Sequence, residues 1–109
     1  MNRYPIHKSA SIAGGETTSG VVDLGSFRAL AIGLPAAFDG TTLTVEAAPE
    51  ADGAFQPVYD DAGTAMSLTV AAGHVVVVDA APLAALRFVR FVAGTAQAAD
   101  RVLVLYLKD

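Results

Sequence analysis

The sequence predicts an all-β protein built from antiparallel strands. Segments in which apolar and polar residues alternate recur at the spacing of about 8–12 residues that is typical of β-sandwiches and barrels. Turn signals separate these segments, above all the Asp-Gly pairs of "FDGT" (38–41) and "ADGA" (51–54). Such pairs supply the positive φ that tight hairpins need. Because loops this short leave no room for the crossover helices of a parallel sheet, neighbouring strands are expected to run antiparallel.

About eight strands are expected, and the clearest is Thr42–Ala47. Leu43, Val45 and Ala47 alternate there with polar residues, which indicates a strand with one buried face. At most one short helical turn is expected, in "DAAPLAAL" (79–86), where Pro82 suits a first helical position. Eight strands are placed near residues 4–12, 20–24, 27–34, 42–48, 55–60, 65–71, 74–79 and 86–92, and a last one near 101–107.

The N-terminal residues 1–18 are expected to form an arm, and residues 19–109 the β-sandwich domain. Residues 1–15 carry two basic side chains and no acidic one, and they end in Gly14 and Gly15. A pliable segment of this kind becomes ordered where a partner offers strand pairing. We therefore expect the arm to lie along a neighbouring subunit, with Tyr4 and Ile6 on its buried face.

Three segments carry large apolar residues on both faces: 74–79, 86–92 and 101–107. Strands buried on both sides are typical of parallel sheets, which the short loops exclude. The second face then needs a cover, which the N-terminal arm, a long loop or another subunit would provide. We expect another subunit, in a cyclic homo-oligomer that is a trimer or a pentamer. The predicted interface residues are Tyr4, Ile6, Arg87, Val89, Phe91, Leu103 and Leu105.

Charges are segregated along the chain. No Lys or Arg occurs between Ala29 and Leu86, where seven acidic residues lie, while the basic residues lie near the two ends. Two interpretations remain open. The segregation either reflects solubility alone, or basic terminal segments meet an acidic surface of a neighbouring subunit.

Composition excludes several classes of protein. The chain has 109 residues, enough for one domain with its own core, and no cysteine, so disulfides and thiolate metal sites are impossible. Hydrophobic residues make up 53% and charged residues 17%, which is a low charge content. No apolar run is long enough to cross a bilayer, and no signal peptide is recognisable. The net charge of −4 and the lack of a basic stripe argue against nucleic-acid binding.

The sequence assigns no catalytic, cofactor-binding or metal-binding residue. His7 and His74 have no partners at the spacing of a catalytic triad or a zinc site. Asp60 and Asp61 are adjacent but lack the pattern of a calcium loop, so a solvated turn is expected. "GGETTSG" (14–20) lacks the Gly-Lys-Ser/Thr ending of a phosphate loop. We therefore expect neither an enzyme nor a cofactor.

Five sequence motifs follow one another in an order similar to that of a known family. The motifs "SGVVDLG" (19–25), "GLPAAFDGTTLTVEAAPEADGAFQPVYDDAG" (33–63), "SLTVAAG" (67–73), "LRFVRF" (86–91) and "QAADRVLVL" (97–105) occur in this order. This order resembles that of a family of small virion structural proteins of tailed bacteriophages. The resemblance covers residues 19–107, and its more specific part is "PAAF" together with "VYDDAG".

The resemblance implies a jelly-roll-like β-sandwich built into or onto the virion, as in capsid decoration proteins and head-spike bases. The motifs do not fix the position within the virion. The leading hypothesis is a protein that decorates or cements the capsid, assembled in the host cytoplasm, whose partner is the major capsid protein or another virion protein. Neither a nucleic-acid nor a membrane partner is expected, because the chain is acidic and has no apolar run long enough to cross a bilayer. The alternative is a ligand- or carbohydrate-binding module of a phage spike or tail, since sandwich loops often carry such sites.

Overall fold

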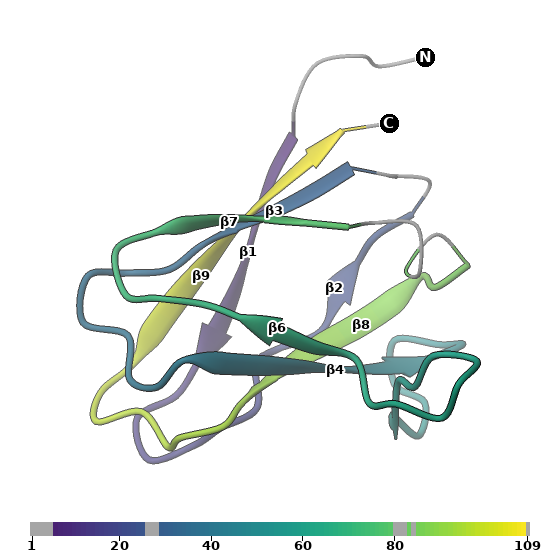
Figure 1. Ribbon diagram of the computed structural model, residues 1–109, viewed down its shortest axis with the longest axis horizontal. Coiled ribbons are helices and arrows are strands. Elements are labelled where there is room, and N and C mark those ends of the chain that lie inside the picture. Colours follow the sequence, from purple (N-terminus) through teal and green to yellow (C-terminus); the bar gives the residue numbers. More distant parts are fainter. Residues whose placement is uncertain (1–5, 26–28, 80–82, 84, 109) are drawn as a thin grey trace.

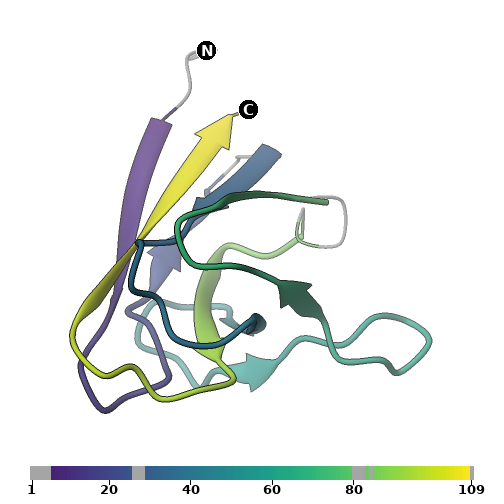
Figure 2. The same ribbon diagram turned by 60° about the vertical axis from the view of Figure 1, so that its left-hand side comes forward.

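The computed structural model describes residues 6–25, 29–79, 83 and 85–108, which form two antiparallel β-sheets packed face to face (Figures 1 and 2). No helix among these residues is long and apolar enough to cross a membrane. Of the helical turn expected at 79–86, residues 80–82 and 84 lie outside this description, and Leu86 N donates to Leu83 O at 3.0 Å. The nine strands are β1 (Ile6–Ile12), β2 (Val22–Asp23), β3 (Ala29–Gly33), β4 (Thr42–Ala48), β5 (Gln56–Pro57), β6 (Ser67–Thr69), β7 (Val75–Val78), β8 (Phe88–Ala93) and β9 (Arg101–Lys108).

The strand pairing is that of one long hairpin rolled up on itself. Five antiparallel pairings run along the hairpin: β1 with β9, β2 with β8, β3 with β7, β4 with β5, and β4 with β6. Rolling sends alternate pairs to opposite sheets, where β3 pairs with β9 and β4 with β8. The resulting orders, β1-β9-β3-β7 and β2-β8-β4-β5, are those of a jelly roll. The predicted all-β, antiparallel, jelly-roll-like sandwich is confirmed.

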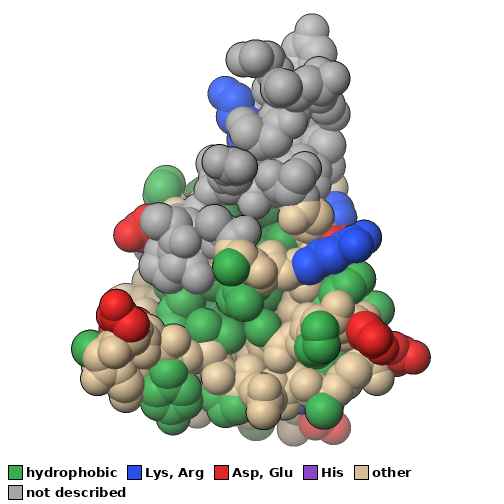
Figure 3. Space-filling model, turned by 90° about the vertical axis from the view of Figure 1, so that its right-hand side faces the viewer, with side chains coloured by type: hydrophobic (Ala, Val, Ile, Leu, Met, Phe, Trp, Pro, Cys, Tyr) green, Lys and Arg blue, Asp and Glu red, His purple; other side chains and the backbone are tan. Residues whose placement is uncertain are grey.

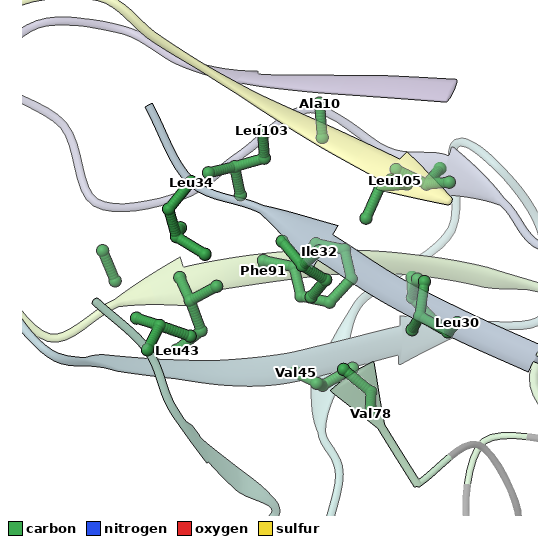
Figure 4. Packing of buried hydrophobic residues seen from close by; sticks show 14 of the residues in the cluster. Ala10, Leu30, Ile32, Leu34, Leu43, Val45, Val78, Phe91, Leu103 and Leu105 are labelled. Carbon is green, nitrogen blue, oxygen red and sulfur yellow. The ribbon is translucent and has the colours of Figure 1, made fainter. Parts of the chain in front are cut away.

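The core lies between the sheets, and the longer strands fill it with every second residue. In β8 the buried residues are Val89, Phe91 and Ala93, and in β9 they are Leu103, Leu105 and Leu107. Figure 4 shows Phe91 of β8 and Ile32 of β3 pointing toward one another across the space between the sheets. The alternation predicted for Thr42–Ala47 is confirmed for Leu43 and Val45, which are 0% and 1% exposed.

Four of the predicted interface residues belong to this core instead. Val89, Phe91, Leu103 and Leu105 are each 0% exposed within a single chain, so they have no surface to offer a neighbouring subunit. The prediction was wrong about the face. Both faces of β8 and β9 are apolar, and the period of two does not say which of them turns inward.

The other three predicted interface residues have different positions. Arg87 is exposed, and its Nε lies 3.1 Å from Asp23 Oδ1 in an ion pair of the same chain. Ile6 begins β1, where its backbone pairs with that of Leu107. Tyr4 lies outside the described residues.

The arm expected at residues 1–18 is corrected from residue 6 onward. Residues 6–12 pair with β9 of the same chain at seven register positions, and Ala10 and Ile12 are buried in its core. Gly15, with φ of 84°, turns the chain, and Thr18 and Ser19 then bridge back to Val92 and Ile12. This segment is therefore an edge strand and a turn of the sandwich. Residues 1–5 lie outside the description.

The two Asp-Gly turns differ. Gly40 adopts the predicted positive φ, 94°, and a Cβ built on it would come within 2.9 Å of Thr95 Oγ1. Gly53 does not adopt a positive φ, and its turn is instead closed by its N–H donating to Glu50 O at 3.1 Å. The Asp-Gly pairs predicted the positions of both turns correctly, but the predicted positive φ is found only at Gly40.

A buried glutamine joins the loops at one end of the sandwich. Gln97 is 1% exposed, and its side-chain amide donates to Asp39 O and Thr95 O at 2.9 and 3.0 Å. Its Oε1 accepts from Asp39 N at 2.9 Å, and its backbone N–H and C=O bond Glu16 and Gly15. The side chain of Gln97 thus ties the segment 93–100 to the loop at Asp39, and the backbone of Gln97 ties it to the loop at Gly15 and Glu16.

We expect Gln97→Ala to lower the free energy of unfolding by about 3 kcal/mol, because it removes the three hydrogen bonds that the buried Gln97 side chain makes to Asp39 and Thr95, each worth about 1 kcal/mol. Urea denaturation followed by circular dichroism measures this. The control is Gln56→Ala in exposed β5, for which a change below about 0.5 kcal/mol is expected. Equal effects of the two substitutions would show that the Gln97 hydrogen bonds contribute nothing specific.

Candidate interaction surface

The outer face of the β1-β9-β3-β7 sheet is largely apolar. The register aligns outward-pointing residues into rows: Val75, Gly33, Val104 and Ser9 form one, and Val77, Ala31, Tyr106 and His7 the next. Val77 is 83% exposed, Val75 58% and Val102 49%. We call this surface the valine face and define it by Ala31, Gly33, Val75, Val77, Val102, Val104 and Tyr106.

The ring of Tyr106 is held on this face from both sides. His7 of β1 packs against it edge to face, with ring centroids 4.9 Å apart. On the other side, a Cβ built on Gly33 would lie 3.2 Å from Tyr106 Cε1, so the absence of a side chain on β3 leaves room for the ring. Beside the ring is a shallow hollow of about 400 Å³, lined by Leu30, Ala31, Val75, Val77, Tyr106, Leu107 and Lys108.

The valine face offers apolar area and little chemistry. Contiguous exposed apolar patches are found where proteins bind other proteins, membranes or ligands. Among the described residues, no group of three or more His, Cys, Asp or Glu is placed to hold a metal ion. The sequence did not predict this face. The interface residues predicted on β9, Leu103 and Leu105, point inward, whereas the valine face is formed by residues that point outward.

A second exposed region lies at the end of the sandwich that carries the loops after β4 and β5. Tyr59 is 58% exposed there and lines two hollows of about 590 and 540 Å³. Figure 3 looks at this end, where hydrophobic side chains gather across the middle of the surface and acidic side chains lie at its flanks. Beside it, Arg90 lies over the ring of Phe55 at 4.6 Å and pairs with Glu46 at 2.6 Å.

The carboxylates next to Tyr59 are used in part by the turn itself. Asp60 Oδ1 accepts hydrogen bonds from the backbone N–H groups of Ala62 and Thr64, both at 2.9 Å. Gly63 completes the turn with a φ of 82°. Asp60 is therefore a turn-forming residue, as the sequence predicted for the Asp60–Asp61 pair, and Asp61 is exposed beside it.

The segregated charges meet within one chain. Arg90 pairs with Glu46, and Arg101 pairs with Asp39 at 3.3 Å. These two contacts join C-terminal bases to acids of the middle segment, which the antiparallel pairing of β4 with β8 and the Gln97 loop bring together. Arg90 and Arg101 therefore find their acidic partners within the same chain and do not require those of a neighbouring subunit.

Hydrogen bonds favour the charged forms of two of the carboxylates. The N–H of Ala98 donates to Asp39 Oδ2 at 2.8 Å and, with Arg101, holds the pKa of Asp39 below its usual value. The guanidinium of Arg87 lowers the pKa of Asp23 and has its own pKa raised in return. Because both carboxyl groups stay ionised at neutral pH, Asp39 keeps its ion pair with Arg101 and Asp23 keeps its ion pair with Arg87.

Comparison with known proteins gives a likeness of fold. The chain is similar to the crystal structure of SPBc2 prophage-derived protein YomS, with a TM-score of 0.59 and 16% sequence identity. The likeness covers 100% of this chain and 98% of that one, so the two share the whole sandwich. No protein-family profile matches the sequence, and no curated protein matches it.

Proposed function

We propose that the chain is a non-catalytic structural protein of a tailed-phage virion, which decorates or cements the capsid. In this role it adds contacts between major capsid subunits, so that the shell resists the pressure of the packaged DNA. It would reach the particle after synthesis in the host cytoplasm, with the major capsid protein or another virion protein as its partner.

The observation that carries this proposal is the similarity of fold over the full length to a prophage-derived protein. The motif order over residues 19–107, which resembles that of small phage virion proteins, supports it independently. The valine face adds a physical reason, because an exposed apolar sheet face suits a protein contact better than a soluble ligand.

Particles assembled without the chain test the proposal. If it cements the capsid, such particles should release their DNA at a lower temperature than complete ones, as followed with a DNA-binding dye. Adding the purified protein should restore the release temperature, and a variant that cannot fold should not. Identical release temperatures with and without the protein would contradict the cementing role.

Exposure of Tyr59 favours a second candidate function, a ligand- or carbohydrate-binding module of a spike or tail. The Tyr59 ring lies between two hollows, and Asp61 and Gln56 line them as well. Small-molecule sites combine such hollows with an apolar surface and a few polar groups. If this function holds, a panel of oligosaccharides should include one that shifts the amide NMR signals of residues lining the hollows.

For such a ligand, we expect Tyr59→Ala to raise the Kd by about tenfold, or about 1.4 kcal/mol. The control Val102→Ala lies on the valine face and should leave the Kd unchanged. If no oligosaccharide in the panel shifts these signals, the binding-module alternative is rejected.

A further inference from the structure

The edges of the two sheets are protected unequally. β2, β5 and β6 are two or three residues long, and β5 contains Pro57. The edge strand β1 points the charged Lys8 inward at its end of the sheet, where Nζ donates to Asp23 O at 2.6 Å. Short strands, proline and inward charges are the usual devices against edge-to-edge pairing. β7 has none of them, since it consists of four valines.

Only every second residue of β7 directs its backbone hydrogen-bonding groups to β3. Leu34 N donates to His74 O at 2.9 Å, which fixes the alternation of the ladder between β3 and β7. The even-numbered residues of β7 therefore direct their N–H and C=O groups to β3, and Val75 and Val77 direct theirs away from it. Within the described part of the chain, no strand pairs with this side of β7, and no loop makes a backbone hydrogen bond to Val75 or Val77.

We propose that a second copy of this chain pairs with β7, antiparallel and about a two-fold axis, with Val75 of each copy opposite Val77 of the other. Within β7, Val75 and Val77 alone direct their backbone groups away from β3, and only a pairing between these residues keeps the two valine faces on the same side. Two hydrogen-bonded pairs of this kind exchange about four backbone hydrogen bonds. The two four-stranded sheets would join into one.

Side chains agree with this register. The pairing places two Val75–Val77 cross-strand contacts side by side on the valine face, covering the most exposed apolar groups of each copy. No charge lies between His74 and Asp79. An antiparallel pair brings the His74 end of one β7 to the Asp79 end of the other, so no like charges meet.

The contact closes on itself, because one edge accepts one strand. It therefore produces a dimer with an isologous interface, in place of the trimer or pentamer expected from the sequence. This inference does not depend on the virion role, since it follows from the edge and the exposed valines alone.

Light scattering coupled to size-exclusion chromatography tests the dimer. The wild-type chain should be a dimer, and Val77→Lys should raise the dimer Kd by about 100-fold or more. Val77→Pro should also dissociate the dimer, because proline lacks the backbone N–H that the proposed pairing uses. The fold of the single chain should tolerate this change, since that N–H makes no hydrogen bond to β3. Val102→Lys is the control: it places the same charge on the valine face but away from β7, and the dimer should persist. Circular dichroism confirms that each variant is folded.

The register has its own test, because the chain has no cysteine. Opposed residues of a hydrogen-bonded pair have Cα atoms about 5.5 Å apart, within reach of a disulfide. A mixture of Val75→Cys and Val77→Cys chains should therefore cross-link with several-fold higher yield than either variant alone. A wild-type chain that stays monomeric at high concentration, or a dimer that survives Val77→Lys and Val77→Pro, would overturn the proposal. Equal cross-linking of the separate variants and the mixture would overturn the register.

Discussion

Replacing Phe91 by Asp should leave the chain unfolded at 25 °C. Phe91 is 0% exposed at the centre of β8 and points between the sheets toward Ile32 (Figure 4). Removing a buried Phe side chain alone costs about 3–5 kcal/mol. An unpaired carboxylate in the same place adds a large desolvation cost, and the sum approaches the whole stability of a domain, about 5–15 kcal/mol.

Circular dichroism and the dispersion of amide NMR signals measure this loss. The control Val102→Asp introduces the same carboxylate on an outward-facing position of β9, and the chain should remain folded. If Phe91→Asp gave a folded chain with only its self-association weakened, Phe91 would lie at an interface, and the core described above would be wrong.

Deleting residues 2–12 should also prevent folding. The deletion removes β1, so β9 loses its partner at seven register positions and becomes an edge strand. It also removes Ala10 and Ile12 from the core, leaving Leu103 without its cross-strand neighbour Ala10. Losing a strand and two core residues together exceeds what a small sandwich tolerates.

The matched control is deletion of residues 2–5, which leaves β1 whole. That chain should show the strand-rich circular dichroism spectrum and cooperative thermal unfolding, whereas the longer deletion should show neither. A folded chain after deletion of residues 2–12 would restore the interpretation of this segment as an arm.

Local signals in the sequence were enough to predict the fold class. The alternation at Leu43 and Val45 and the turn at Gly40 depend on neighbours in sequence, and both are found in the structure. Short loops imposed antiparallel pairing, and a long antiparallel hairpin has few ways to bury its apolar faces. The nine strands therefore lie close to their predicted positions.

The choice of face could not be predicted for β8. Phe88 and Phe91 point to opposite sides of the strand, and both are large and apolar, so pattern alone does not decide which enters the core. The decision comes from register with β4, which places Phe91 opposite Val45 and Arg90 opposite Glu46. Such pairings join residues more than forty positions apart and leave no local trace.

The role of residues 6–12 was hidden for a different reason. An edge strand with one solvent face needs only every second residue to be apolar, and in "HKSASI" Ala10 and Ile12 alone meet that condition. The adjacent Gly14 and Gly15 suggest a hinge by composition, although Gly15 is held by a hydrogen bond to Gln97 O at 2.7 Å. The pairing of residues 6–12 with β9 and the hydrogen bond from Gly15 to Gln97 both join segments far apart in the sequence, so neither can be predicted from the local sequence.

The copy number of the chain in purified virions tests the central claim, its role as a capsid-decorating protein, most directly. Quantitative mass spectrometry against isotope-labelled peptides, with the major capsid protein as internal reference, gives this number. A cement protein should be present in hundreds of copies, in a fixed ratio to the major capsid protein. A few to a few tens of copies per particle, or none, would contradict it.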